Sequence, residues 1–308
     1  MIALAPRAQK ILVYEAPNSA QGIIRVYNRI AQDHQASVIS TSWGMSEIDT
    51  PSSLLETENA IFKQIAAQGQ AFFAASGDSG AYDQSSQIAV DDPASQPYVV
   101  GVGGTQLSRN TDGTYAAEAT WNDPAKGAGG GGGVSAVWSQ PQWQKSAVST
   151  DSKGSSQFRN VPDVSLNSDP RNGYAILVDG KWHVAGGTSC AAPLWAAFTS
   201  LVNQNRQKLG LTQLGFPLPV LYAIGQSNLY STTFHDIADG STNFYYPAVA
   251  NYDEATGWGS FKGLPLTDAL SLKALPQPPL PSPTQIPNPA SNPTNSGSMT
   301  SNPATGCI

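Results

Sequence analysis

The chain has 308 residues, 40% of them hydrophobic, and a formal net charge of -6 at pH 7. This length and apolar fraction are enough for one large domain with its own core. The acidic balance argues against nucleic-acid binding, and no apolar run is long enough to span a bilayer.

Two further features of the sequence bear on the conditions in which the protein is stable and on its export. Only 12% of the residues are charged, about half the usual share. Because few carboxylates can gain protons as pH falls, such a surface should lose less stability in acid. Residues 1–6 show no charged region before a long apolar stretch, so no signal peptide is predicted in this chain.

Apolar runs alternate with segments of helical spacing in the first third of the chain. We expect buried strands at 10–14, 37–42, 71–75 and 99–102, and amphipathic helices at 20–32 and 54–68. Strands that are continuous apolar runs, separated by helices, indicate a parallel sheet covered on both faces. Residues 175–178 are a further expected strand and residues 193–209 a further helix.

The character of the chain changes at its C-terminal end. Residues 276–308 contain nine prolines and no Asp, Glu, Lys or Arg. Such a segment cannot bury enough apolar surface to order itself. We therefore expect one domain over residues 1–275 and a Pro/Ser/Asn-rich disordered tail or linker over residues 276–308.

The strongest chemical signal is the string GGTSCAAP at 186–193, between an expected strand and an expected helix. Its glycines permit close approach of a substrate, and the helix start places Ser189 where partial positive charge favours an anion. Pro193 suits a first helical turn. Ser189 is therefore a candidate nucleophile, and a serine nucleophile needs a base.

Subtilisin-type peptidases have a similar Gly-Thr-Ser string and use His with Asp as the base. The histidines here are His34, His183 and His235, and none lies in a comparable setting. We interpret them as surface or structural residues. A histidine-dependent mechanism stays open as an alternative.

Several other strings occur in a fixed order along the chain. They are STSWG at 40–44, SGDSG at 76–80, DPAS at 92–95, GGT at 103–105, WND at 121–123, GGGVS at 131–135, VPDV at 161–164, HDI at 235–237 and YDEATG at 252–257. Together with the region of Ser189 they resemble the sedolisin family of serine-carboxyl peptidases, including the kumamolisin type, from residue 3 to about residue 263. The resemblance implies a subtilisin-like α/β fold with a parallel sheet and helices on both faces.

The resemblance also implies catalytic and substrate-binding roles. Asp78 would stabilise the oxyanion, because a protonated carboxyl group can donate a hydrogen bond and burial keeps it protonated in acid. Ser42, Trp43 and Gly44 would align the substrate backbone, and Asp91 would lie near the substrate pocket. The alternatives are a plain Asp turn for Asp78, a core aromatic for Trp43 and a solvated loop carboxylate for Asp91.

One calcium ion is the cofactor that the resemblance implies. Its ligands would be Asp236, Ile237, Val249, Asn251 and Asp253, through two carboxylates and three backbone carbonyls, and hard oxygen ligands suit calcium. Val249 and Asn251 stand at positions often held by glycine in the family. A polar loop with both aspartates solvated is the alternative.

The family's general base is a Glu, supported by an Asp four residues later, and the string then continues into Ala-Leu-Ala-Pro. Residues 3–6 are that continuation, so the pair would precede Met1. We therefore expect a chain truncated at its N-terminus, without the first strand and helix of the domain and without a propeptide. Such a chain should have little or no activity, because Ser189 would lack its base.

The expected function is that of a secreted, monomeric endopeptidase acting on proteins or peptides at acidic pH. The main rival is a non-catalytic, calcium-stabilised pseudopeptidase or binding module with the same fold. A cell-surface adhesin tethered by the Pro-rich tail is a third possibility, with only that tail in its favour.

Overall fold

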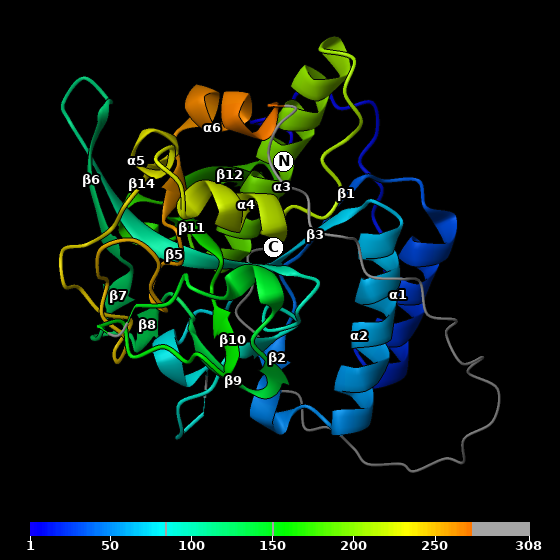
Figure 1. Ribbon diagram of the computed structural model, residues 1–308, viewed down its shortest axis with the longest axis horizontal. Helices are drawn as coiled ribbons and strands as arrows, with labels where there is room; N and C mark the ends of the chain where they lie inside the picture. Colours follow the sequence, from blue (N-terminus) through cyan, green and yellow to red (C-terminus); the bar gives the residue numbers. More distant parts are fainter. Residues whose placement is uncertain (84, 150, 273–308) are drawn as a thin grey trace.

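The structure is a computed structural model that describes residues 1–83, 85–149 and 151–272 (Figure 1). The expected tail at 276–308 lies outside the described residues. Within them, no helix is long and apolar enough to cross a membrane.

A mostly parallel sheet forms the centre of the molecule. Its parallel strands follow the spatial order β1 (Val38–Thr41), β3 (Ala71–Ala75), β5 (Val100–Arg109) and β11 (Val164–Asn167). The far end of β5 also pairs with the antiparallel β6 (Tyr115–Thr120). The predicted parallel sheet is confirmed, and the predicted strand at 71–75 matches β3.

Helices cover both faces of this sheet (Figure 1). Successive side chains of β3 point to opposite faces of the sheet. Phe73 belongs to the core cluster beneath α3 (Thr188–Lys208), whereas Phe72 belongs to the cluster beneath α1 (Ala20–Asp33) and α2 (Ser52–Ala67). A strand that is apolar at every position is therefore required here. Helices α4 (Leu218–Gly225) and α6 (Gly263–Leu270) add to the α3 side.

Short antiparallel pairs surround the sheet. They are β2 (Met45–Ser46) with β4 (Asp91–Asp92), β7 (Asn122–Asp123) with β8 (Ala128–Gly129), β9 (Gly133–Ser139) with β10 (Phe158–Val161), β12 (Tyr174–Val178) with β13 (Lys181–Ala185), and β14 (Phe234–His235) with β15 (Ser260–Phe261). The remaining α-helix is α5 (Tyr230–Thr233).

Two of the predicted elements need correction, and a third is confirmed outside the parallel sheet. Residues 10–14 form no strand, and Val13 is 77% exposed: an apolar run becomes a strand only beside a partner edge, and no described segment pairs with this one. The strand predicted at 175–178 is present as β12, which pairs with β13 in a hairpin. Helix α3 begins at Thr188, five residues before the predicted start, so Pro193 lies inside the helix.

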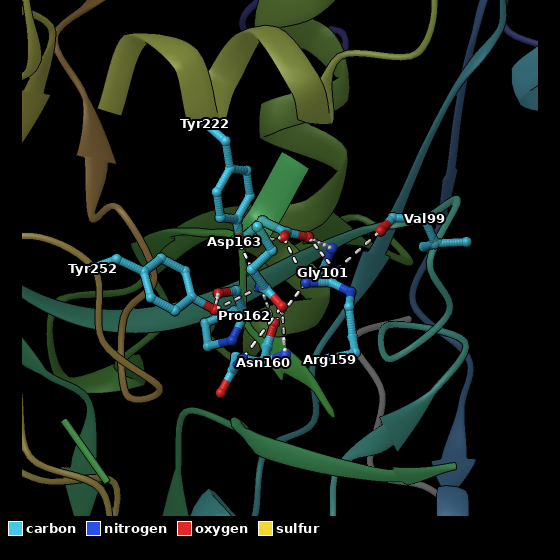
Figure 2. Close-up of polar contacts among 9 residues, drawn as sticks. Val99, Gly101, Arg159, Asn160, Pro162, Asp163, Tyr222 and Tyr252 are labelled. Carbon is cyan, nitrogen blue, oxygen red and sulfur yellow. Dashed lines mark hydrogen bonds and ion pairs between the residues drawn. The ribbon is translucent and has the colours of Figure 1, made fainter. Parts of the chain in front are cut away.

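A buried ion pair joins a residue of β10 to the residue just before β11. Arg159 donates to both carboxylate oxygens of Asp163, at 2.8 and 2.6 Å, and neither side chain is exposed (Figure 2). The hydroxyl of Tyr222 and the amide of Gly101 each donate to the same carboxylate at 2.8 Å. The hydroxyl of Tyr252 donates to the Pro162 carbonyl. Strand β11 therefore starts from a position fixed by charge as well as by packing.

Candidate active site

Ser189 is the second residue of α3, directly after a two-glycine loop. The N-cap residue Gly187 has a φ of 102°, and a Cβ atom there would lie 2.6 Å from Oδ2 of Asp78. Both the backbone conformation and the space therefore require glycine. The first amides of a 21-residue helix give Ser189 a partly positive setting. Ser189 is half-buried.

Asp78 lies beside the start of the same helix, three residues after the end of β3. Its Oδ1 atom accepts hydrogen bonds from the backbone amide and the hydroxyl of Thr188, each at 2.7 Å. The residue is half-buried as a whole, but its carboxyl group lies against Gly187. Burial raises the pKa of the Asp78 carboxyl, and the two bonds from Thr188 oppose that rise. Oδ2 is the oxygen left to carry a proton.

The segment 42–44 follows β1, at the same edge of the sheet. The Ser42 hydroxyl donates to the backbone carbonyl of Ser189 at 2.9 Å. Trp43 is 67% exposed, which makes the core-aromatic alternative wrong. Gly44 has no room for a side chain, because a Cβ atom would lie 2.1 Å from Oδ1 of Asp91. The structure thus brings Ser42 and Asp78 to the backbone around Ser189, whereas Gly44 lies against Asp91.

Asp91 is buried, so the alternative of a solvated loop carboxylate is wrong. It lies on β4, paired with Ser46 of β2, and its Oδ1 atom has no hydrogen-bond partner among the described residues. Burial and then the charge of Asp83 raise the pKa of Asp91. Burial, followed by the charges of Asp49 and Asp78, raises the pKa of Asp83 to about 7.

A second carboxyl pair lies behind this strand and was not predicted. Glu58 on α2 and Asp92 on β4 are both buried, and their carboxyl groups are hydrogen-bonded. Burial and then the charge of Asp92 raise the pKa of Glu58 to about 10. Burial also raises the pKa of Asp92 to about 6, although the bonds from Glu58 and Gln96 lower it. A bond between two carboxyl groups requires one of them to carry a proton.

No histidine is hydrogen-bonded to Ser189 among the described residues, and the Ser189 hydroxyl has no hydrogen-bond partner there. His34 caps the end of α1 in a left-handed conformation, and His183 is exposed on β13. His235 stacks on Tyr115 with ring centroids 3.8 Å apart, and burial followed by the charge of Lys262 lowers its pKa to about 4.

The predicted metal ligands lie in two segments that meet at Tyr230. The Tyr230 hydroxyl donates to Oδ1 of Asp236 at 2.9 Å and lies 3.4 Å from the carbonyl oxygen of Asn251. The amide of Asn251 donates to Oδ2 of Asp236. Asn251 has a φ of 70°, in the left-handed region that asparagine tolerates better than most residues.

Some, but not all, of the predicted oxygen ligands in this loop are arranged to bind a hard cation. Asp236 and the Asn251 carbonyl provide oxygen atoms on one side, as calcium prefers. The carboxylate of Asp253 instead accepts hydrogen bonds from the backbone amides of Val249, Ala255 and Thr256. No group of three or more His, Cys, Asp or Glu in the described ranges is arranged to hold a metal, so carbonyls would have to complete the set.

Comparisons with known proteins show which family this chain resembles as a whole. The Subtilase family matches residues 6–243. Kumamolisin from Bacillus sp. (strain MN-32) is 39% identical over 279 residues, covering 87% of this chain and 49% of that protein. Sedolisin from Pseudomonas sp. (strain 101) is 34% identical over 274 residues, covering 82% of this chain and 44% of that protein. The chain thus spans about half the length of the curated relatives it matches.

The subtilisin-like α/β fold that the sequence resemblance implies is confirmed by a solved structure. Pseudomonas sedolisin, a serine-carboxyl proteinase complexed with two molecules of pseudo-iodotyrostatin, matches with a TM-score of 0.71 and 33% identity. The match covers 82% of this chain and 69% of that one.

Proposed function

The chain belongs to the sedolisin family of serine-carboxyl peptidases, within the subtilases, and from this membership we propose that it is an endopeptidase that hydrolyses proteins at acidic pH. The observation that carries the proposal is the contact of Asp78 with Thr188, next to Ser189. It places a carboxyl group with a raised pKa beside a serine at a helix start. We also propose that the protein acts as a monomer outside the cell.

Ser189 is the proposed nucleophile and Asp78 the proposed oxyanion donor. The Ser189 Oγ atom bonds to the carbonyl carbon of the scissile peptide, and the carbonyl oxygen takes the negative charge. With Oδ1 held by Thr188, the protonated Oδ2 of Asp78 is free to donate to that oxyanion. When the intermediate collapses, the C–N bond breaks and the amine leaves with the proton that the Ser189 hydroxyl gave to the base. Water then adds to the acyl carbon, which releases the carboxylic acid and restores the Ser189 hydroxyl. Asp78 must be neutral to donate, so the proposed activity would be confined to acidic pH.

The base that takes the Ser189 proton is the open part of this mechanism. No described carboxylate or imidazole is hydrogen-bonded to the Ser189 hydroxyl. The family resemblance implies a Glu supported by an Asp. We propose that the 308-residue chain, used alone, has little peptidase activity, because an unassisted serine is a weak nucleophile.

Substrate would lie along the segment 42–44, with Trp43 exposed at its outer side. Strand β1 is at one end of the described strand order, so an extended peptide could add beside it. Asp91 would lie beneath Gly44, on the inner side of that segment. This arrangement suits a peptide substrate in extended form.

One calcium ion is the proposed cofactor, held by Asp236 and Asp253 with the carbonyls of Ile237, Val249 and Asn251. In this position the ion would stabilise the loop and take no part in the reaction. The left-handed backbone of Asn251 supports the proposal.

A second candidate function is that of a non-catalytic peptide-binding module. The observation in its favour is the Ser189 hydroxyl, which has no base bonded to it in the described part of the chain. Both candidates predict peptide binding, and only the first predicts a reactive serine.

The decisive experiment combines acid proteolysis with labelling of Ser189. The chain and its Ser189→Ala variant are incubated at pH 3 to 5 with a protein substrate and, separately, with a peptidyl fluorophosphonate, and the adduct is mapped by mass spectrometry. We expect slow labelling of Ser189 and little proteolysis. Rapid proteolysis lost in Ser189→Ala would overturn the proposed inactivity but support the peptidase. Peptide binding with no Ser189 adduct would favour the binding module.

A further inference from the structure

Pro193 removes a hydrogen bond from the helix that carries Ser189. In an α-helix the amide at position 193 would donate to the carbonyl at position 189, four residues earlier. A proline has no amide hydrogen, and its ring crowds that carbonyl. Because Pro193 lies inside α3, the Ser189 carbonyl has lost its ordinary helical donor.

Ser42 provides the missing donor from another part of the chain. Its hydroxyl donates to the Ser189 carbonyl at 2.9 Å, across 147 positions of sequence. Ser42 is half-buried and follows β1 by one residue, and α3 packs against β1. A half-buried carbonyl without a partner would cost free energy, so this bond has a clear role in the folded state.

The backbone around Ser189 is therefore held from both sides. On one side, Thr188 is bound to Asp78 through its amide and its hydroxyl. On the other, the carbonyl of Ser189 itself is bound to Ser42. These two anchors come from the ends of β3 and β1, which are neighbouring strands of the sheet. Between them lies the Cα atom from which the nucleophilic side chain projects.

We propose that Ser42 is a positioning residue that holds Ser189 in place and replaces the helical bond that Pro193 omits. The Ser42 hydroxyl then acts through the backbone of the nucleophile, whereas the proposed alignment of substrate along the segment 42–44 uses the backbone of that segment. The importance of this bond for reactivity rests on the proposed function, since it takes Ser189 as the nucleophile. That the bond anchors the backbone of Ser189 does not depend on the proposed function.

The test uses the compensation that the geometry predicts. Ser42→Ala removes the donor, and Pro193→Ala restores an amide that can reach the Ser189 carbonyl. The double variant should therefore behave like Pro193→Ala alone. The matched control is Ser200→Ala, which removes a hydroxyl bond to the Ala196 carbonyl farther along the same helix. Thermal melting of each variant establishes that it is folded.

Two readouts are needed. The first is amide hydrogen exchange over residues 188–194, which we expect to be about tenfold faster in Ser42→Ala and to return within about threefold of Pro193→Ala in the double variant. The second is the rate of Ser189 labelling by the peptidyl fluorophosphonate, with a lower maximal rate and an unchanged half-saturating concentration in Ser42→Ala.

The outcomes separate the two proposals. Unchanged exchange in Ser42→Ala, or no compensation by Pro193→Ala, would overturn the positioning role. A changed half-saturating concentration with an unchanged maximal rate would also overturn it, because it would make Ser42 a substrate contact. If the exchange results hold but Ser189 is not labelled even in the unaltered chain, the proposed peptidase function fails and the anchor stands.

Discussion

Thr188 donates two hydrogen bonds to a single oxygen of Asp78, one from its backbone amide and one from its hydroxyl, both at 2.7 Å. This arrangement leaves the other oxygen of Asp78 as the site of protonation. The reactivity of Ser189 should then follow the protonation of Asp78. Two substitutions at this position distinguish the ability of the side chain to donate a hydrogen bond from its ability to ionise.

Asp78→Asn keeps a donor at every pH, because its amide nitrogen can take the place of the protonated oxygen while its carbonyl accepts from Thr188. We expect Ser189 labelling to continue toward neutral pH in this variant, whereas it falls in the unaltered chain as Asp78 ionises. Asp78→Ala should lose about a hundredfold in labelling rate in acid, and the difference from the unaltered chain should shrink as Asp78 ionises there. Identical pH profiles for Asp78→Asn and the unaltered chain would contradict the oxyanion role.

Stability should be greatest in acid because of the buried carboxyl groups. The folded state raises the pKa of Glu58 to about 10, of Asp83 to about 7 and of Asp92 to about 6. Their contribution is fully present below about pH 4, where the unfolded chain is protonated too, and is lost as pH rises from there through these raised values. The melting temperature should therefore fall between pH 4 and pH 7.

Glu58→Gln tests this directly, because it can still donate to Asp92 but cannot ionise. In urea unfolding at a series of pH values, its free energy of unfolding should depend less steeply on pH, by up to about 1.4 kcal/mol per pH unit. Glu56→Gln is the control, since Glu56 is exposed on the same helix. Equal slopes in all three proteins would show that Glu58 does not hold a proton in the folded state.

The pair of Glu58 and Asp92 illustrates how far sequence reasoning reaches. Glu58 stands in the apolar stripe of α2, between Leu54, Leu55, Ile61 and Phe62, and this spacing alone indicates burial. Its partner is 34 residues away on a two-residue strand, and no local pattern identifies such a contact. Periodicity therefore predicted the helix and its buried face, but not the second carboxyl group that faces it.

The candidate site shows the same division. Ser189 was recognised from its glycine-rich string before a helix, whereas the roles of Asp78 and of the segment 42–44 came only from the resemblance of their strings to the family. The bond from Ser42 to the Ser189 carbonyl was not predicted, although Pro193 was the signal for it: a proline four residues after a helical residue leaves that residue's carbonyl without its helical donor. The prediction of a strand at 10–14 was wrong because an apolar run forms a strand only beside the edge of another strand, and a single sequence does not show that edge.

Breaking the buried ion pair should be far more costly than breaking an exposed one. Arg159→Met leaves the carboxylate of Asp163 buried without its partner, and we expect a loss of about 3–5 kcal/mol in urea unfolding. Arg29→Met is the control, because Arg29 is 67% exposed and its partner Asp33 is 19% exposed, so its loss should cost about 1 kcal/mol or less. Similar losses in the two variants would mean that the network of Figure 2 contributes little to stability.

Removal of calcium should lower thermal stability if the loop around Asp236 binds the ion. We expect a chelator to reduce the melting temperature by several degrees and added calcium to restore it, because an ion that binds only the folded state stabilises that state by mass action. Asp236→Asn should abolish the response, since Asp236 lies next to the Asn251 carbonyl at the Tyr230 hydroxyl. Asp239→Asn is the control, because Asp239 is exposed and, among the residues that the structure describes, bonds only to Ser241. A melting temperature that does not change with calcium in the unaltered chain would mean that Tyr230 and the loop amides satisfy the two aspartates without a metal.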